Sequence, residues 1–177
     1  MTRKKYELLK DDKIELYGKT LYRIKALIDF DIVVAGSLGG YIEKEDNLAH
    51  TGNAWVFGDA RVFGDAQVYS DAQVYGNARV LGDVNVCGNA SVCGNAFVYS
   101  EEDLVWFSNV GTEQGTLTVY KSKDGSLLAS RGCFSGTVDE FLAKSAKVHN
   151  DRIKREYRLL IEVAKSRLLG ESYVPTF

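Results

Sequence analysis

The sequence contains little cysteine and no long apolar run, and each of these two shortages excludes a class of protein. Three cysteines, none of them in a CxxC pair, are too few for a secreted disulfide framework or a cysteine zinc site. No apolar stretch approaches the roughly 20 residues that cross a bilayer. The basic N-terminus leads into charged residues and does not resemble a signal peptide. We therefore expect a cytosolic protein without a membrane span.

The net charge of −2 leaves the molecule as a whole without the excess of basic residues that binding of bulk nucleic acid requires. Basic residues gather in the segment 138–169, which holds eight Lys or Arg against five acids. A polyanionic partner would meet this segment first. Arg152 and Arg155 are the interface candidates there, and a solvated helix face is the alternative.

Residues 54–101 repeat with a period of six. Eight consecutive, nearly identical hexads follow the consensus Ala-x-Val-x-Gly-Asp/Asn, with Val84, Ser70, Ser100 and Glu101 as departures, and a degenerate ninth copy, 48–53, precedes them without an insertion. Side chains alternate along a strand, so the Ala and Val positions face one core. Gly followed by Asp or Asn suits a corner, because both residue types tolerate positive φ.

Three such corners close a coil of 18 residues, so nine hexads predict about three stacked coils. An antiparallel meander is the alternative, but six residues leave no room for hairpins. The pattern resembles the hexapeptide-repeat proteins, and that resemblance implies a left-handed coil, an exception to the usual right-handed crossover. We predict an all-β core, a left-handed parallel β-helix, with small β caps at both ends and a C-terminal α-helical tail.

The flanking segments divide the chain into an N-terminal β cap (1–47), the β-helix (48–101), a β hairpin or sheet (102–136) and C-terminal helices (137–177). Alternating runs at 6–9, 14–16 and 21–30 predict an antiparallel sheet. The glycine-rich segment Gly36–Glu43 lacks the helix that a phosphate-binding loop needs, and we interpret it as a turn into the first coil.

After the repeat, the segments 104–109, 116–121 and 127–134 predict strands, with an Asp-Gly hairpin turn within 123–126. Thr137 and Glu140 form a capping box that opens a helix. The segment 149–151 breaks that helix, and an amphipathic second helix follows and stops near Gly170. Its apolar stripe fits either packing or a partner groove.

Stacking residue i on residue i+18 places large side chains in columns on the outside of the coils. These interface candidates are Trp55, Phe57, Phe63, Tyr69, Tyr75, Leu81 and Tyr99. Apolar surface patches mark interfaces, which favours a homo-oligomer, a trimer above all. The alternative is that the flanking segments of the same chain cover the columns.

Nearly the whole chain resembles a family of uncharacterised phage and prophage proteins. The segments 21–26 (LYRIKA), 38–48 (LGGYIEKEDNL), the hexads and 132–141 (GCFSGTVDEF) carry the resemblance. It implies a small accessory protein of a mobile element in a bacterial cytoplasm, with a host protein or a host-defence component as a reasonable partner. It implies no reaction.

The enzyme hypothesis rests on resemblance to trimeric hexapeptide-repeat acyltransferases, which use a histidine base. His50 and His149 are the candidate bases, and Cys133 is a candidate nucleophile. We place His50 at the core valine position of the ninth copy and His149 at the helix break. Both positions suit structural roles, so we favour a non-catalytic binding or assembly protein that needs no cofactor and no metal.

Overall fold

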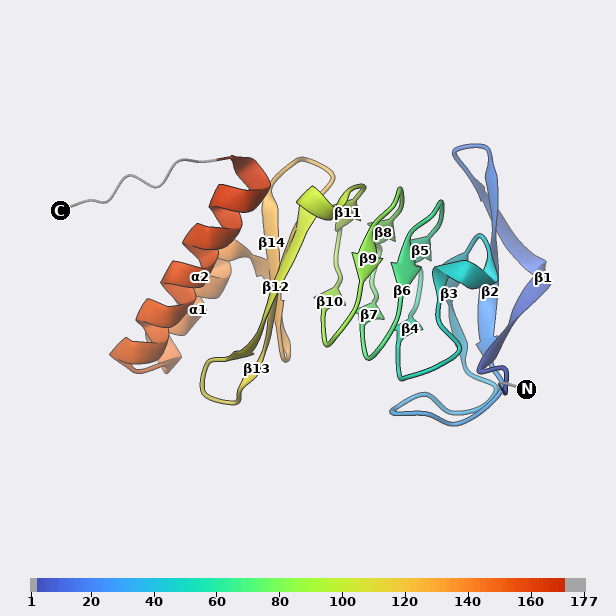
Figure 1. Cartoon of the computed structure of the whole chain (residues 1–177), viewed down its shortest axis with the longest axis horizontal. Coiled ribbons are helices and arrows are strands. Elements are labelled where there is room, and N and C mark those ends of the chain that lie inside the picture. Colours follow the sequence, from blue (N-terminus) through green and yellow to red (C-terminus); the bar gives the residue numbers. More distant parts are fainter. Residues whose placement is uncertain (1–2, 171–177) are drawn as a thin grey trace.

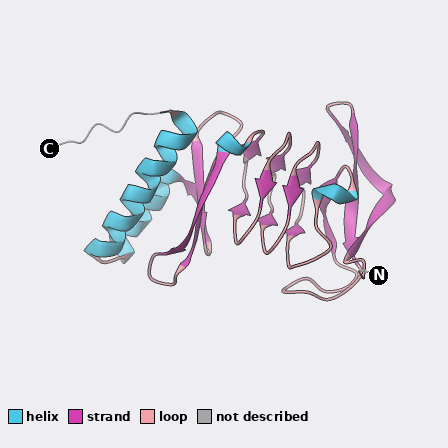
Figure 2. Cartoon of the chain, viewed as in Figure 1, coloured by secondary structure: helices cyan, strands magenta, loops and turns pink. Residues whose placement is uncertain are grey.

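The computed structural model describes residues 3–170 and has four parts in a row (Figure 1). A β cap at the N-terminal end is followed by a parallel β-solenoid of about three coils, an antiparallel sheet and two helices (Figure 2). The predicted order of elements is therefore confirmed. No helix among the residues described has the length and apolar character of a bilayer span.

The solenoid consists of two-residue strands, one for each hexad. They are β4 (Trp55–Val56), β5 (Arg61–Val62), β6 (Gln67–Val68), β7 (Gln73–Val74), β8 (Arg79–Val80), β9 (Asn85–Val86), β10 (Ser91–Val92) and β11 (Phe97–Val98). Each strand pairs in parallel with a strand 18 residues away in the sequence, as Trp55 does with Gln73 and Gln73 with Ser91. The strand valines and the alanines before them fill the core. The predicted register is confirmed for all eight hexads.

The N-terminal cap is an antiparallel sheet of β1 (Tyr6–Leu16), β2 (Lys19–Ala26) and β3 (Leu38–Ile42), with a bulge in β1. Strand β3 also pairs in parallel with β5, so the cap and the first face of the solenoid form one sheet. The prediction that Gly36–Glu43 forms a turn into the first coil is wrong for residues 38–42, because these form strand β3. A Cβ on Gly40 would lie 2.5 Å from the Ala60 carbonyl oxygen, so glycine permits this close approach.

The ninth repeat copy has a different register from the predicted one. Leu48, and not His50, pairs with Val68 and lies in the core, where it is 1% exposed. His50 lies outside the core with its ring stacked on Tyr6, the ring centroids being 4.2 Å apart. The reason is a longer corner between Leu48 and Ala54, preceded by the short 3₁₀ helix η1 (Glu45–Asn47). The prediction that His50 occupies a core position is therefore wrong.

The C-terminal sheet consists of β12 (Leu104–Val110), β13 (Gly115–Lys121), β14 (Leu127–Arg131) and β15 (Phe134–Thr137), and the 3₁₀ helix η2 (Glu101–Asp103) leads into it. One face of β13 contacts the last coil. Thr118 Oγ1 accepts a hydrogen bond from the Ser91 N–H (3.0 Å), and the Ser130 hydroxyl donates to the Ser91 carbonyl. Side chains thus satisfy the backbone that a terminal coil leaves unpaired.

The helices α1 (Val138–Val148) and α2 (Asp151–Leu169) cover the other face of this sheet (Figure 1). The capping box of Thr137 and Glu140, the break after Val148 and the left-handed Gly170 at the end of α2 are all confirmed. The apolar stripe of α2 packs on the sheet through Ile153, Tyr157, Leu160, Ile161, Ala164 and Leu168. It is therefore core and not a partner groove.

Candidate functional site

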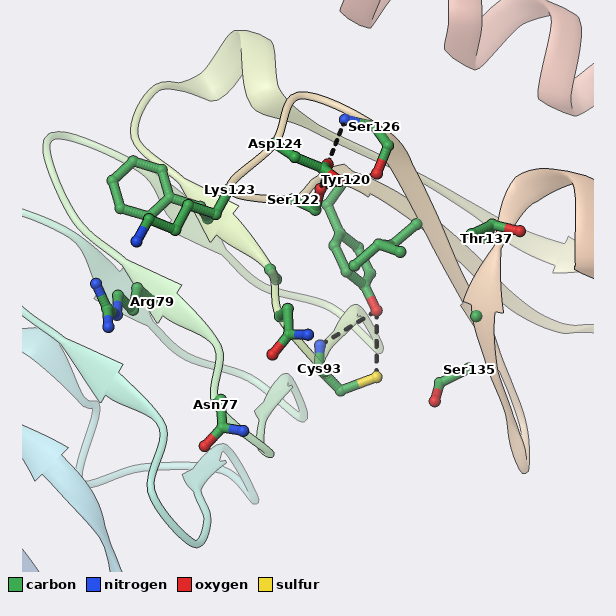
Figure 3. Close-up of a pocket in the computed structure, with 16 residues that line it drawn as sticks. Asn77, Arg79, Cys93, Tyr120, Ser122, Lys123, Asp124, Ser126, Ser135 and Thr137 are labelled. Carbon is green, nitrogen blue, oxygen red and sulfur yellow. Dashed lines mark hydrogen bonds between the residues drawn. The ribbon is translucent and has the colours of Figure 1, made fainter.

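A cleft of about 550 Å³ lies where the third coil meets the C-terminal sheet (Figure 3). One wall is the solenoid, with Asn77 and Arg79, and the other is the sheet, with Ser135 and Thr137. The β13–β14 hairpin, which carries Lys123, forms the rim. Polar side chains from segments far apart in the sequence therefore converge here.

A buried tyrosine and cysteine form the floor of the cleft. Tyr120 accepts a hydrogen bond from the Cys93 backbone N–H (3.2 Å), and its hydroxyl lies 3.1 Å from Cys93 Sγ. Burial raises the pKa of Tyr120 far above its usual range. The Tyr120 phenol is therefore neutral and joins the sheet to the last coil, a structural role.

The Asp124 carboxylate on the rim forms hydrogen bonds within its own hairpin. Asp124 accepts hydrogen bonds from the Ser122 hydroxyl and from the Ser126 backbone N–H, the latter at 2.9 Å. These bonds lower the pKa of Asp124 to about 2, and the bond from Ser122 contributes most. Figure 3 shows the carboxylate turned toward Ser126, away from the neighbouring Lys123.

Two arginines stand directly next to each other on the solenoid face that leads into the cleft. Arg61 on β5 pairs in register with Arg79 on β8. Arg79 Nη1 donates to the Tyr17 hydroxyl (3.2 Å), whereas Arg61 Nε is buried without a hydrogen-bond partner. Sequence reasoning missed this pair as a site. The signal was available, because residues 61 and 79 are 18 positions apart and both are arginine.

His50 is held in the N-terminal cap. Its Nδ1 accepts a hydrogen bond from the Lys5 backbone N–H (3.1 Å), and its Nε2 lies 3.3 Å from Glu45 Oε2. With Nδ1 occupied as an acceptor, Nε2 carries the proton and donates to Glu45. No ring nitrogen is left to take a proton from a substrate, although a shallow pocket of about 370 Å³ adjoins the residue.

Cys133 and His149 line one cleft of about 280 Å³ between α1 and the β14–β15 turn, together with Arg131. The sequence presents Cys133 and His149 as separate candidates, and the structure brings them to one cleft. His149 Nδ1, however, is 3.0 Å from the Ser145 hydroxyl. No hydrogen bond joins the Cys133 thiol to His149 within residues 3–170.

The outer columns are covered to different extents. Trp55, Phe63 and Leu81 are buried by the chain itself, so they are not available to a partner. Tyr6 and Phe30 pack against Trp55, while the β1–β2 hairpin packs on the other two. This corrects the prediction that these three form an interface. Phe57, Tyr69 and Tyr75 are partly buried and Tyr99 is 60% exposed.

The basic candidates of the tail lie on the outer side of α2. Arg152 and Arg155 are both exposed, on the face opposite to the buried stripe. Neither forms an ion pair within the part of the chain that the structure describes. A solvated helix face accounts for both residues, and their role in an interface stays a prediction.

Comparison with known proteins supports the repeat architecture. A family model described as the YdcK beta solenoid repeat matches residues 72–88, which span the second and third coils. The chain is therefore similar to that repeat family over a short segment. No curated protein matches the chain.

Proposed function

We propose that this chain is a non-catalytic accessory protein of the phage type that uses a rigid β-solenoid for self-association and partner binding. The supporting observation is an ordered loop between β2 and β3 that, with the first residue of β3, exposes large aliphatic side chains. They are Leu27, Ile32 and Val34 of the loop and Leu38 of β3, with exposures from 41% to 73%. Exposed apolar surface concentrated on one segment is typical of an interaction site.

Hydrogen bonds hold this loop in one conformation. Ala26 and Ser37 are bonded through their backbones at the base, and Phe30 and Val33 exchange two backbone bonds near the tip. The Asp29 carboxylate accepts a further bond from the Ala35 N–H (2.7 Å). A preorganised loop loses little conformational entropy on binding, which favours association.

A second copy of the chain is the partner we propose for this loop. Burial of one large aliphatic side chain is worth roughly 1.5–3 kcal/mol, and several copies related by closed symmetry bury such side chains without forming filaments. Resemblance to trimeric hexapeptide-repeat proteins favours a trimer. A phage-type protein would offer the remaining surface to a host protein, such as a defence component.

The mass of the purified protein in solution tests self-association. We expect light scattering at high micromolar concentration to give three times the chain mass of 19.6 kDa. Ile32→Glu should dissociate the assembly, because it places a charge in the apolar contact. Leu159→Glu, at an exposed apolar position on α2, is the control and should leave the mass unchanged.

The variants also separate two interfaces. Dissociation caused by Tyr99→Glu but not by Ile32→Glu would move the interface to the Tyr99 column, as the sequence suggested. A mass of about 20 kDa for the unmodified protein at every concentration would contradict self-association altogether.

The alternative function is an acyltransferase, and an assay of acyl transfer distinguishes it from the non-catalytic protein that we propose. We expect no acyl transfer from acyl-coenzyme A donors to sugar or amine acceptors, because His50 has no free acceptor nitrogen and a base must reach the acceptor hydroxyl. A coupled thiol-release assay measures this. Turnover that disappears in His50→Ala or His149→Ala, with the circular dichroism spectrum unchanged, would establish the enzyme hypothesis.

A further inference from the structure

Two positive charges lie in adjacent rungs of the solenoid without an anion between them. Arg61 and Arg79 pair in register on β5 and β8, and neighbouring strands are about 4.8 Å apart. Like charges directly opposite one another destabilise a sheet. No carboxylate within residues 3–170 forms an ion pair with either guanidinium, and Arg61 Nε is buried without a partner.

A third cation, Lys123 on the rim, lines the same cleft as Arg79. Figure 3 shows the Lys123 ammonium and the Arg79 guanidinium directed toward the same side of the cleft. Asp124 on the same hairpin keeps its negative charge, but it hydrogen-bonds to Ser122 and Ser126 and forms no ion pair with Lys123 within residues 3–170. Arg79 and Lys123 therefore outnumber the one carboxylate that lines the cleft, which leaves an excess of positive charge for a ligand.

The rest of the lining suits the remainder of a small molecule. The amides of Asn77 and Asn95 and the hydroxyls of Ser135 and Thr137 offer hydrogen bonds, while Phe97 provides an aromatic surface. The volume of about 550 Å³ lies within the range of small-molecule sites. The cleft therefore combines a cationic end with polar and aromatic walls.

We propose that this cleft binds a small phosphorylated molecule, with its phosphate on Arg79 and Lys123, while Arg61 adds its charge from the rung next to Arg79. A guanidinium presents a planar fork of donors that matches two phosphate oxygens, and an ammonium adds a point charge. A phosphate dianion also removes the repulsion between the stacked arginines. The amides and hydroxyls then contact the sugar or base that carries the phosphate.

Isothermal titration calorimetry on the full chain tests this with four probes: inorganic phosphate, adenosine monophosphate, glucose 6-phosphate and adenosine. We expect a phosphorylated probe to bind and adenosine to bind at least about tenfold more weakly, since the phosphate supplies the charge-assisted bonds. Tighter binding of adenosine monophosphate than of glucose 6-phosphate would identify a nucleotide, and the reverse order would identify a sugar phosphate.

Charge-neutralising variants locate the binding. Arg79→Gln and Lys123→Gln should each raise the dissociation constant about tenfold or more. Arg158→Gln removes an equal charge on the exposed side of α2 and should leave it within about twofold. Thermal unfolding of each variant without a probe checks its fold, and Arg61→Gln should melt no lower than the unmodified protein because it relieves the repulsion.

Two results would overturn the proposal. One is the absence of binding by every phosphorylated probe at concentrations up to about 10 mM. A site built for such a ligand would have a dissociation constant below that concentration. The other is an equal loss in Arg79→Gln and Arg158→Gln, which would show a response to net charge alone. The solution mass of the chain is measured separately, so a monomer that binds phosphate would contradict self-association and leave this site intact.

Discussion

Replacing Val74 with Asp is expected to unfold the solenoid. Val74 is 0% exposed and lies in the second coil, paired with Val56 on one side and Val92 on the other. A buried carboxylate without a partner costs several kcal/mol, which is comparable to the whole stability of a domain of this size, about 5–15 kcal/mol. We expect loss of the soluble folded protein, measured by thermal unfolding and by yield in the soluble fraction.

The neighbouring residue provides a matched control. Gln73 precedes Val74 on the same strand but is directed out of the core and is partly exposed. Gln73→Asp introduces the same charge one position away and should change the free energy of unfolding by less than about 1 kcal/mol. If Val74→Asp remained soluble with an unchanged melting temperature, the core register of the repeat would be incorrect.

The periodic part of the chain was predictable because its structure is local and repeated. The positions of Ala72 and Val74 in a hexad determine what is buried, and the Gly-Asp or Gly-Asn corner determines where the strand ends. Each hexad supports the register of the next one through pairing at 18 residues. The capping box at Thr137 and the end of α2 at Gly170 were predictable for the same reason, since each depends on neighbours in sequence.

The first coil was predicted less well because contacts distant in sequence set its register. Leu48 and His50 are both compatible with a core position by sequence. The contacts that decide between them come from Lys5 and Tyr6: Lys5 bonds to His50, and the Tyr6 hydroxyl donates to the Leu48 carbonyl (2.7 Å). Such contacts across more than 40 residues leave no periodic signal.

The same limit applies to the outer surface and to the cleft. The columns of Phe63 and Leu81 were readable from the repeat, but the hairpin that covers them is placed by tertiary packing. Likewise, Arg61 and Arg79 follow from the spacing of 18, whereas the approach of Lys123 depends on how the sheet docks on the last coil. Sequence therefore indicated which side chains point outward, and the structure was needed to show what they meet.

Glycine at the corners of the coils has two separate causes, and Gly82→Ala compared with Gly58→Ala distinguishes them. Both glycines precede an aspartate at a corner, and both have positive φ, +75° and +59°. A side chain in that region costs roughly 1–2 kcal/mol. Only Gly82 is also sterically confined: a Cβ there would lie 2.1 Å from the Tyr99 carbonyl oxygen, whereas nothing lies within 4 Å of one on Gly58.

We therefore expect Gly58→Ala to lower the free energy of unfolding by about 1 kcal/mol. Gly82→Ala should lower it by roughly a further 1–3 kcal/mol, because the backbone of the next coil must move to relieve the clash. Urea unfolding measures both, and an unchanged slope with denaturant would show that only stability has changed. Equal losses in the two variants would mean that backbone conformation alone selects glycine at the corners, and that the coils stack less closely at Gly82 than the structure shows.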